Sequence, residues 1–175
     1  AGSDSSGGAG IQADIKSFSA LGVYAASVVT AVTAQNTKGV SAVEDISLPV
    51  IAAQMDAVFS DLDINAVKIG MVSRADTIRT IAERLQRQTQ PVVLDPVMVA
   101  TSGDRLLREN AIETLRADLL PLARLVTPNL PEAALLTGTP IASDRQAAIR
   151  QAEAILKLGA SAVLIKGGHG TGAQS

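Results

Sequence analysis

The first ten residues, AGSDSSGGAG, include four glycines and three serines and lie directly before an amphipathic stretch, IQADIKSFSALG. Glycine allows backbone conformations and close approaches that a Cβ atom forbids. The N-terminus of the helix that follows offers unpaired N–H groups and a positive partial charge. This combination predicts a cradle for an anion or a small ligand, although the composition of the segment would fit a flexible linker equally well.

Two well-known phosphate cradles can be excluded for this stretch. The P-loop needs Gly, four residues and then Gly-Lys-Ser/Thr; Gly2 and Gly7 have that spacing, but Gly8 stands where the lysine is required. The dinucleotide fingerprint Gly-x-Gly-x-x-Gly is not supplied by Gly7-Gly8-Ala9-Gly10. A dinucleotide-dependent oxidoreductase is therefore disfavoured.

Four further segments with polar or glycine-rich character follow predicted strands: AQNTKG, DPVMVATSGD, TPNLPE and KGGHG. In a parallel sheet the working residues lie in the loops beyond the carboxyl ends of the strands. We therefore expect these segments and the opening loop to converge on one edge of a sheet.

The elements that must position these segments alternate between helices and strands. Helical spacing of Ile11, Ile15, Phe18 and Leu21 predicts a first helix that Gly22 ends. Further helices are predicted over 49–61, 74–88, 109–121 and 144–159, and strands over 27–35, 40–47, 66–70, 91–95, 124–129 and 161–168. The β-branched stretch 27–35 is typical of a strand covered on both faces. The alternation implies right-handed crossovers and an α/β fold with a parallel sheet.

The composition fits one compact domain. The 175 residues are 47% hydrophobic with a net charge of −2, which argues against disorder and against the basic stripe that binds nucleic acid or an anionic membrane. Aromatic residues make up only 2%, so aliphatic side chains must fill the core. The sequence has no cysteine, no apolar run of roughly 18 residues and no signal peptide, so we expect a cytoplasmic protein whose partners are small molecules or other subunits.

Seven motifs in a fixed order carry a resemblance to a known family: AGSDSSGGAGIQAD, TAVTAQNTKGV, KIGM, LDPVM, SGD, TPNLPEA and IKGGH. They span essentially the whole chain and resemble the hydroxymethylpyrimidine and phosphomethylpyrimidine kinases of thiamin biosynthesis. The resemblance implies a ribokinase-like fold, which is a three-layer α/β sandwich around a mainly parallel central sheet. It also implies ATP, Mg²⁺, a homodimer, and phosphorylation of 4-amino-5-hydroxymethyl-2-methylpyrimidine and then of its monophosphate.

In this resemblance the pyrimidine lies against the opening loop. Gly2 and the loop through Ala9 are expected to pack on the ring, and Asp14 to accept a hydrogen bond from its amino group. The amide of Gln35 complements an aminopyrimidine edge, and Met71 forms an apolar wall. From the residues alone, Asp14 could equally favour its helix through the macrodipole, Gln35 could cap a strand end, and Met71 could belong to the core.

The resemblance places the phosphoryl chemistry on other residues. Asn129 and Glu132 match an Asn-x-x-Glu motif that helps to hold hydrated Mg²⁺ and the nucleotide phosphates, whereas the spacing alone favours a helix start. Lys166 matches a catalytic lysine near the transferring phosphates, although a lysine at a strand end is ordinarily solvated. Asp95 is expected to assist metal binding.

Other features of the family either have no assigned role in this sequence or have no match in it. The SGD motif at 102–104 matches the family's segment over the substrate, and His169 has no assigned role. The family has an additional strand before AGSD and a late Gly-Thr-Gly-Cys or Gly-Thr-Gly-Asp motif, which supplies the anion hole. The triplet at 170–172 is followed by Ala173 and is rejected as that motif. We therefore expect residues 1–175 to form a single kinase domain without its first strand and anion-hole region, inactive by itself.

Two other readings remain open. Pyridoxal kinase of the same superfamily shares the DPVM and TPN-x-x-E patterns, whereas AQNTKG and GGAGIQAD favour the pyrimidine. A relative that binds the pyrimidine without turnover would also explain the absence of the late motif from these residues.

Overall fold

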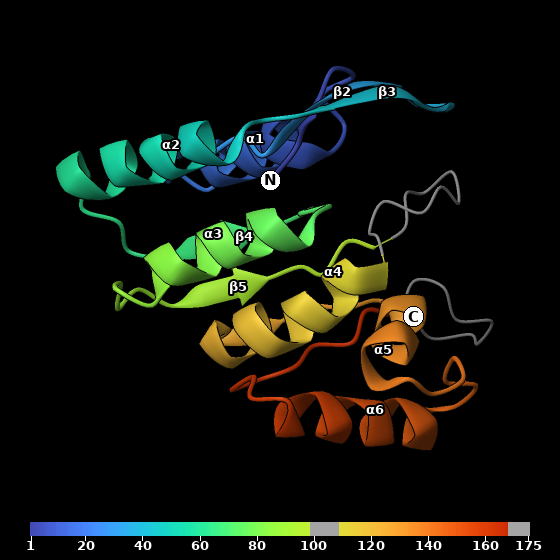
Figure 1. Ribbon diagram of the computed structural model, residues 1–175. Helices are drawn as coiled ribbons and strands as arrows, with labels where there is room; N and C mark the ends of the chain where they lie inside the picture. The colour runs from blue at the N-terminus through green and yellow to red at the C-terminus, as the bar shows by residue number, and fades with distance from the viewer. Residues whose placement is uncertain (99–108, 168–175) are drawn as a thin grey trace.

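Helices and strands alternate along the chain as the periodicity predicts (Figure 1). The structure is a computed structural model that describes residues 1–98 and 109–167. Its strands are β1 (Ser3–Asp4), β2 (Ala31–Asn36), β3 (Gly39–Asp45), β4 (Val67–Ile69), β5 (Val92–Leu94) and β6 (Leu125–Val126). Its helices are α1 (Gly10–Ala20), α2 (Leu48–Asp61), α3 (Ala75–Leu85), α4 (Glu109–Thr114), α5 (Leu130–Thr137) and α6 (Arg145–Lys157); α4 continues as a π-helical turn over Leu115–Leu119 and a 3₁₀ turn over Leu120–Leu122.

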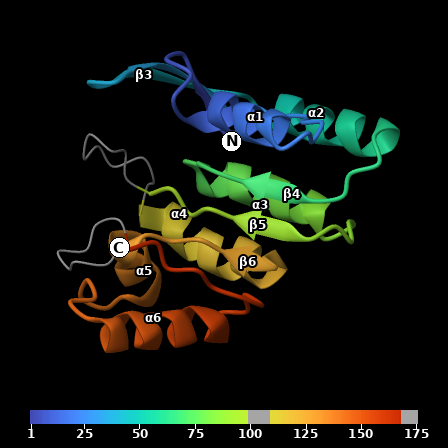
Figure 2. The same ribbon diagram turned by 180° about the vertical axis from the view of Figure 1, so that it is seen from behind.

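The expected mainly parallel sheet is present in two parts among the described residues. In one part β1 runs parallel to β2, and β2 pairs antiparallel with β3. In the other part β4, β5 and β6 are all parallel and neighbour one another in that order, as Figure 2 shows. The expected strand over 161–168 is reduced to two parallel bridges, Val126 with Val163 and Asn129 with Lys166.

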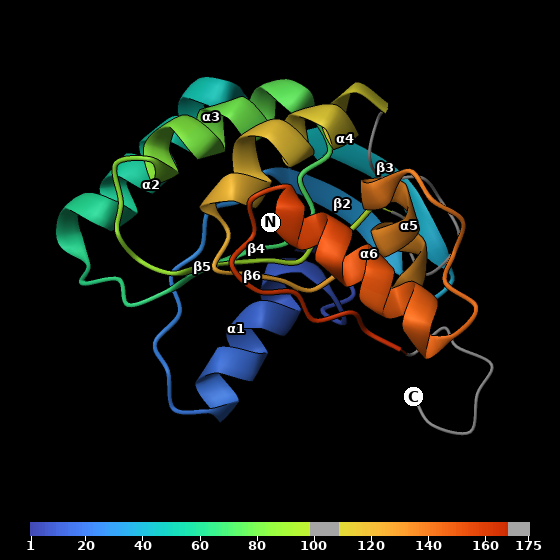
Figure 3. The same ribbon diagram turned by 90° about the horizontal axis from the view of Figure 1, so that it is seen from below.

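Helices lie on both sides of the three parallel strands β4, β5 and β6. Figure 3 shows α1 on one face and α2, α3 and α4 on the other, which is the arrangement that right-handed crossovers produce. The core is aliphatic, as the low aromatic content predicts, and its largest fully buried side chains include Ile51, Ile78, Leu94, Met98, Leu119, Leu120, Leu136 and Ile155. In the part of the chain that the structure describes, no helix has the length and apolar character needed to cross a membrane.

The expectation that residues 27–35 form a strand covered on both faces is wrong. In β2 the side chains of Ala31 and Thr33 are buried, but Val32 between them is 47% exposed. This alternation shows that only one face of β2 is covered over the described residues, and the strand begins at Ala31 instead of residue 27.

An apolar groove of about 580 Å³ lies between α1 and the two parts of the sheet. The apolar face of α1, with Ile11, Ile15 and Phe18, forms one wall, and no residue of α1 is fully buried. The opposite wall is formed by α2 and β4, including Phe59 and Val67. The helix is therefore amphipathic as predicted, but its apolar face borders a cavity instead of a filled core.

Candidate active site

The opening loop folds around the carboxylate of Asp4. Its side chain accepts hydrogen bonds from the backbone N–H groups of Ser6 (2.8 Å), Gly8 (3.1 Å) and Ala9 (2.7 Å), and from the Ser6 hydroxyl. Asp4 is only 3% exposed. Burial alone would raise the pKa of this carboxyl, but the donors of Ser6, Ala9 and Gly8 outweigh it and hold the pKa below its usual range. The loop is therefore an anion cradle whose anion is its own side chain, because these N–H groups already donate to Asp4.

The same loop is attached to the end of β2, where Gln35 lies. The Ser5 hydroxyl donates to the backbone oxygen of Gln35 (2.7 Å) and accepts from its N–H (2.8 Å). The Thr33 hydroxyl lies 2.9 Å from the Ser3 backbone oxygen and 3.2 Å from Oε1 of Gln35. The structure thus brings Gln35 beside the opening loop, as the resemblance implies.

Gly2 and Met71 also lie together. A Cβ atom on buried Gly2 would be 2.8 Å from Cε of Met71, so a larger residue at position 2 would displace the end of this flexible side chain. Gly10 has a φ of 58°, and a Cβ there would be 2.4 Å from the Gly2 backbone oxygen. The close approach of Gly10 to the Gly2 backbone oxygen therefore requires glycine in the opening loop, and Met71 packs against Gly2.

The structure pairs Asp14 with Lys68. The Lys68 ammonium lies 2.9 and 3.1 Å from the two carboxylate oxygens, and each side chain is 25% exposed. Both residues border the groove. Sequence reasoning missed Lys68, although a lysine inside the otherwise apolar strand AVKIG was a signal that it has a partner.

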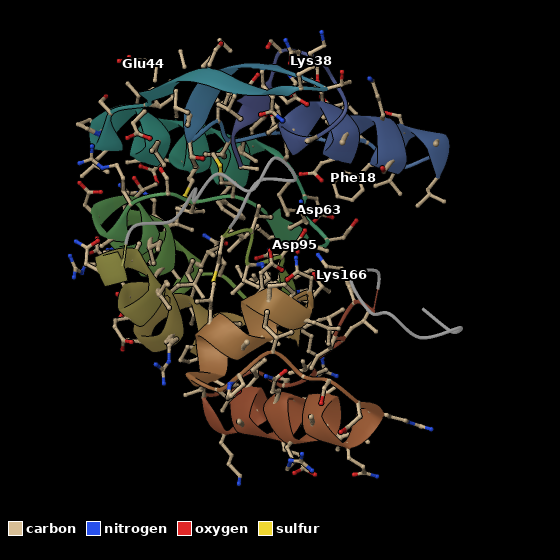
Figure 4. The ribbon with its side chains drawn as sticks, turned by 90° about the vertical axis from the view of Figure 1, so that its right-hand side faces the viewer. Phe18, Lys38, Glu44, Asp63, Asp95 and Lys166 are labelled. Atoms are coloured by element: carbon tan, nitrogen blue, oxygen red, sulfur yellow. The ribbon has the colours of Figure 1, made fainter. Side chains whose placement is uncertain are left out.

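A second group of predicted residues meets at the ends of β5 and β6. Figure 4 shows Asp95 and Lys166 side by side, and their side chains form an ion pair with a separation of 2.7 Å. The Thr127 hydroxyl donates to the same Asp95 oxygen at 3.3 Å. Lys166 is held in place because its backbone N–H donates to the Pro128 carbonyl.

Asn129 and Glu132 form the N-terminal capping box of α5. The Asn129 side chain accepts from the Glu132 N–H, and the Glu132 carboxylate accepts from the Asn129 N–H, both at 2.8 Å. Burial raises the pKa of Glu132 above its usual range, and nearby Asp95 adds to this, whereas the Asn129 N–H and the charge of Lys166 oppose it. The helix-start reading of this motif is confirmed, and the charges of Lys166 and Asp95 both act on this buried carboxylate.

The predicted site residues thus form two groups at the carboxyl edge of the sheet. One comprises the opening loop with Gly2, Ala9, Gln35 and Met71, and the other comprises Asp95, Asn129, Glu132 and Lys166. Over residues 1–98 and 109–167 there is no cluster of three or more His, Cys, Asp or Glu side chains that would bind a metal by protein ligands alone. The SGD motif at 102–104, His169 and the triplet at 170–172 lie outside the described residues.

Comparison with known proteins agrees with this arrangement. The family described as "Phosphomethylpyrimidine kinase" matches residues 4–175. The hydroxymethylpyrimidine/phosphomethylpyrimidine kinase of Rhizobium meliloti is 66% identical over 175 residues, which is 100% of this chain and 66% of that protein. The chain therefore spans just under two thirds of the length of this curated relative.

Solved structures give the same result. The phosphomethylpyrimidine kinase of Clostridium difficile is 52% identical, with a TM-score of 0.91 over 98% of this chain and 74% of that one. The pyridoxal kinase of Staphylococcus aureus in complex with AMP-PCP is 35% identical, with a TM-score of 0.86 over 96% of this chain and 61% of that one. The expected ribokinase-like α/β fold is confirmed, and the chain belongs to the phosphomethylpyrimidine kinase family.

Proposed function

We propose that the protein transfers the γ-phosphoryl group of ATP to 4-amino-5-hydroxymethyl-2-methylpyrimidine and then to the resulting monophosphate, a reaction of thiamin biosynthesis. The observation that carries this proposal is the 66% identity over the whole chain to a relative that bears this name. The nucleotide follows from family membership and from the AMP-PCP complex of the related pyridoxal kinase. A cytoplasmic location, expected from the sequence composition, and a homodimer, implied by the resemblance, complete the proposal.

The first group of residues would bind the pyrimidine. Gly2 and the loop through Ala9 would pack against the ring, with Met71 as the apolar wall next to Gly2. Gln35 would offer its amide donor and acceptor to the aminopyrimidine edge. Asp14, which borders the groove and forms an ion pair with Lys68, would accept from the amino group.

The second group would act on the phosphates. Lys166 would stabilise the charge on the transferring group, and Asn129 and Glu132 would hold the nucleotide end. Asp95 and Glu132 fit a magnesium ion that keeps most of its waters, because such an ion takes one or two carboxylates together with substrate phosphates. Bound there, Mg²⁺ would supply charge neutralisation for the phosphates. The chain's own contribution is to keep Lys166 and two carboxylates within one small region.

The groove beside α1 supports the expected organisation of the domain. An extended, apolar strand would fit between β4 and the segment that leads into β2, and would join the two parts of the sheet. We propose that residues 1–175 are part of a single kinase domain to which such a strand and an anion-hole region contribute. The prediction that these 175 residues alone are inactive depends on this organisation.

The test is an ATP-dependent phosphorylation assay with the complete gene product. We expect it to phosphorylate the pyrimidine alcohol and its monophosphate, and to use pyridoxal poorly. Lys166→Met should lower kcat at least about 100-fold, as loss of a transition-state charge contact does, while the KM for the pyrimidine changes little. The exposed Lys38→Met serves as the matched control. Preference for pyridoxal would support the alternative kinase, and tight pyrimidine binding without turnover would support a non-catalytic relative.

A further inference from the structure

Asp4 is a buried carboxylate for which sequence reasoning assigned no role. Its two oxygens receive three backbone N–H groups and one hydroxyl, all from residues of the same loop. We propose that Asp4 is a positioning residue, whose carboxylate is the internal counter-ion of loop 4–9 and holds the wall that the loop presents to the pyrimidine. The second half of this statement rests on the proposed function.

The distribution of donors explains why a carboxylate is needed. Oδ1 accepts from the Ser6 N–H and hydroxyl, and Oδ2 accepts from the N–H groups of Gly8 and Ala9. Consecutive N–H groups turned to one side of a loop form an anion-binding concavity. The amide oxygen of an asparagine could replace Oδ1 as the acceptor, but its NH₂ group would stand in the place of Oδ2 and would face the N–H donors of Gly8 and Ala9. The charge and both acceptor sites are therefore used.

Asp4 also connects the loop to the elements on either side. Its backbone N–H donates to Oε1 of Gln12 on α1 at 2.8 Å, and Nε2 of Gln12 donates to the Ser3 hydroxyl at 2.7 Å. The Gly7 N–H donates to the backbone oxygen of Asp4 at 3.0 Å. Because β1, the loop and the first turn of α1 all meet at this residue, removal of its charge should loosen the whole wall.

The use of these donors inside the loop has a consequence for substrate orientation. The N–H groups of Ser6, Gly8 and Ala9 point at Asp4 and are not offered to a phosphate. The loop therefore suits a neutral ring, whereas anionic groups of the substrate belong at Lys166.

The first experiment tests the internal counter-ion by chemical rescue. Asp4→Ala removes the carboxylate and leaves the loop donors around an anion-sized space. Formate should raise the melting temperature of Asp4→Ala by several degrees more than chloride does at equal ionic strength, with no such difference for wild type or for the exposed control Asp63→Ala. Equal effects of formate and chloride on Asp4→Ala would overturn the proposal.

Because Asp4→Ala could fail to fold, a second measurement uses the wild-type protein. Inorganic phosphate at millimolar concentration should leave the amide resonances of Ser6, Gly8 and Ala9 unshifted in ¹H–¹⁵N spectra. A saturable shift of these three resonances would show that the donors accept an external anion and would refute the assignment.

The positioning role is tested by steady-state kinetics of the complete enzyme. Asp4→Asn should raise the KM for the pyrimidine about tenfold, which corresponds to about 1.4 kcal/mol, with the KM for ATP unchanged. Formate should restore the pyrimidine KM of Asp4→Ala. If formate restores the stability of Asp4→Ala but neither Asp4 variant changes the KM for the pyrimidine, the positioning role is wrong. If the wild-type enzyme does not phosphorylate the pyrimidine, the proposed function is wrong, while the result of the formate experiment still stands.

Discussion

The ion pair between Asp14 and Lys68 gives a prediction whose size can be worked from the structure. The pair connects α1 to β4 across the groove, with one ammonium between two carboxylate oxygens at 2.9 and 3.1 Å. The perturbation is a double-mutant cycle of Asp14→Asn and Lys68→Met. Its coupling energy isolates the interaction, provided that neither single variant forms new contacts.

Coulomb's law sets the scale of this coupling. At 2.9 Å two unit charges attract by about 1.4 kcal/mol at a dielectric constant of about 80, and by about 6 kcal/mol at an effective value of about 20. Each side chain is one quarter exposed, so solvent screens the pair and ordering the long lysine costs entropy. We expect a coupling energy of about 1–2 kcal/mol, above that of a surface ion pair.

The assay is urea unfolding of the wild type, both single variants and the double variant. The exposed Lys38→Met is the control, and it should change the free energy of unfolding by less than about 0.5 kcal/mol. In the complete enzyme, Asp14→Asn should also raise the KM for the pyrimidine more than Lys68→Met does, because only Asp14 would contact the ring. A coupling energy near zero would refute the interpretation of this contact as a stabilising pair across the groove.

Two further predictions concern the opening loop. Gly10→Ala should reduce the free energy of unfolding in urea by at least about 3 kcal/mol, because a Cβ atom there meets the Gly2 backbone oxygen and the residue has a positive φ. The control Gly22→Ala has a φ of 74° but open space around the new Cβ atom, so it should lose only about 1–2 kcal/mol. Equal losses in the two variants would contradict the close approach at Gly10. The lowered pKa of Asp4 predicts stability that is complete above the unfolded-state pKa of about 3.9 and is lost as the pH falls through the lower folded-state pKa. Glu132 has the opposite sign, because its raised pKa removes stability as the pH rises from about 4.3 to the folded-state value. Urea unfolding between about pH 2.5 and about pH 6 should show a loss of stability in acid that is smaller in Asp4→Asn than in the wild type. An identical loss in both proteins would contradict this prediction.

Much of the fold was predictable because helical and strand periodicities are local properties of the chain. The first helix ends where Gly22 adopts its positive φ, and α2 begins with Pro49 in its first turn, as predicted. The strand β1 was not predicted, because two residues in a Gly/Ser-rich loop become a strand only through pairing with β2. The separation of the sheet into two parts could not be predicted from the sequence either, because it depends on how segments that are distant in the chain are arranged in the fold.

The candidate site was predictable to the extent that strand ends could be located. Gln35, Met71, Asp95 and Lys166 all follow or end predicted strands, and the structure places them at one edge. The use of Asp4 by its own loop was missed, although an Asp followed two residues later by Ser is typical of an Asx turn, and Asp4 accepts from the Ser6 N–H in this way. The number of donors that reach one carboxylate depends on the tertiary path of the loop.

The two groups of the site differ in how their charges are compensated, and this difference fits the two tasks of the proposed reaction. Asp4 is buried and fully hydrogen-bonded, so the ring side is fixed before a substrate arrives. Lys166 is 43% exposed, and its pair with Asp95 is therefore a weak contact of at most about 1 kcal/mol. In the proposed reaction a phosphate oxygen can replace that carboxylate at little cost, whereas loss of the Asp4 carboxylate would take the acceptor from three backbone N–H groups and one hydroxyl. In the proposed reaction the opening loop would thus form a rigid wall for a neutral ring, and Lys166 with Asp95 would form an exchangeable ion pair for the phosphates.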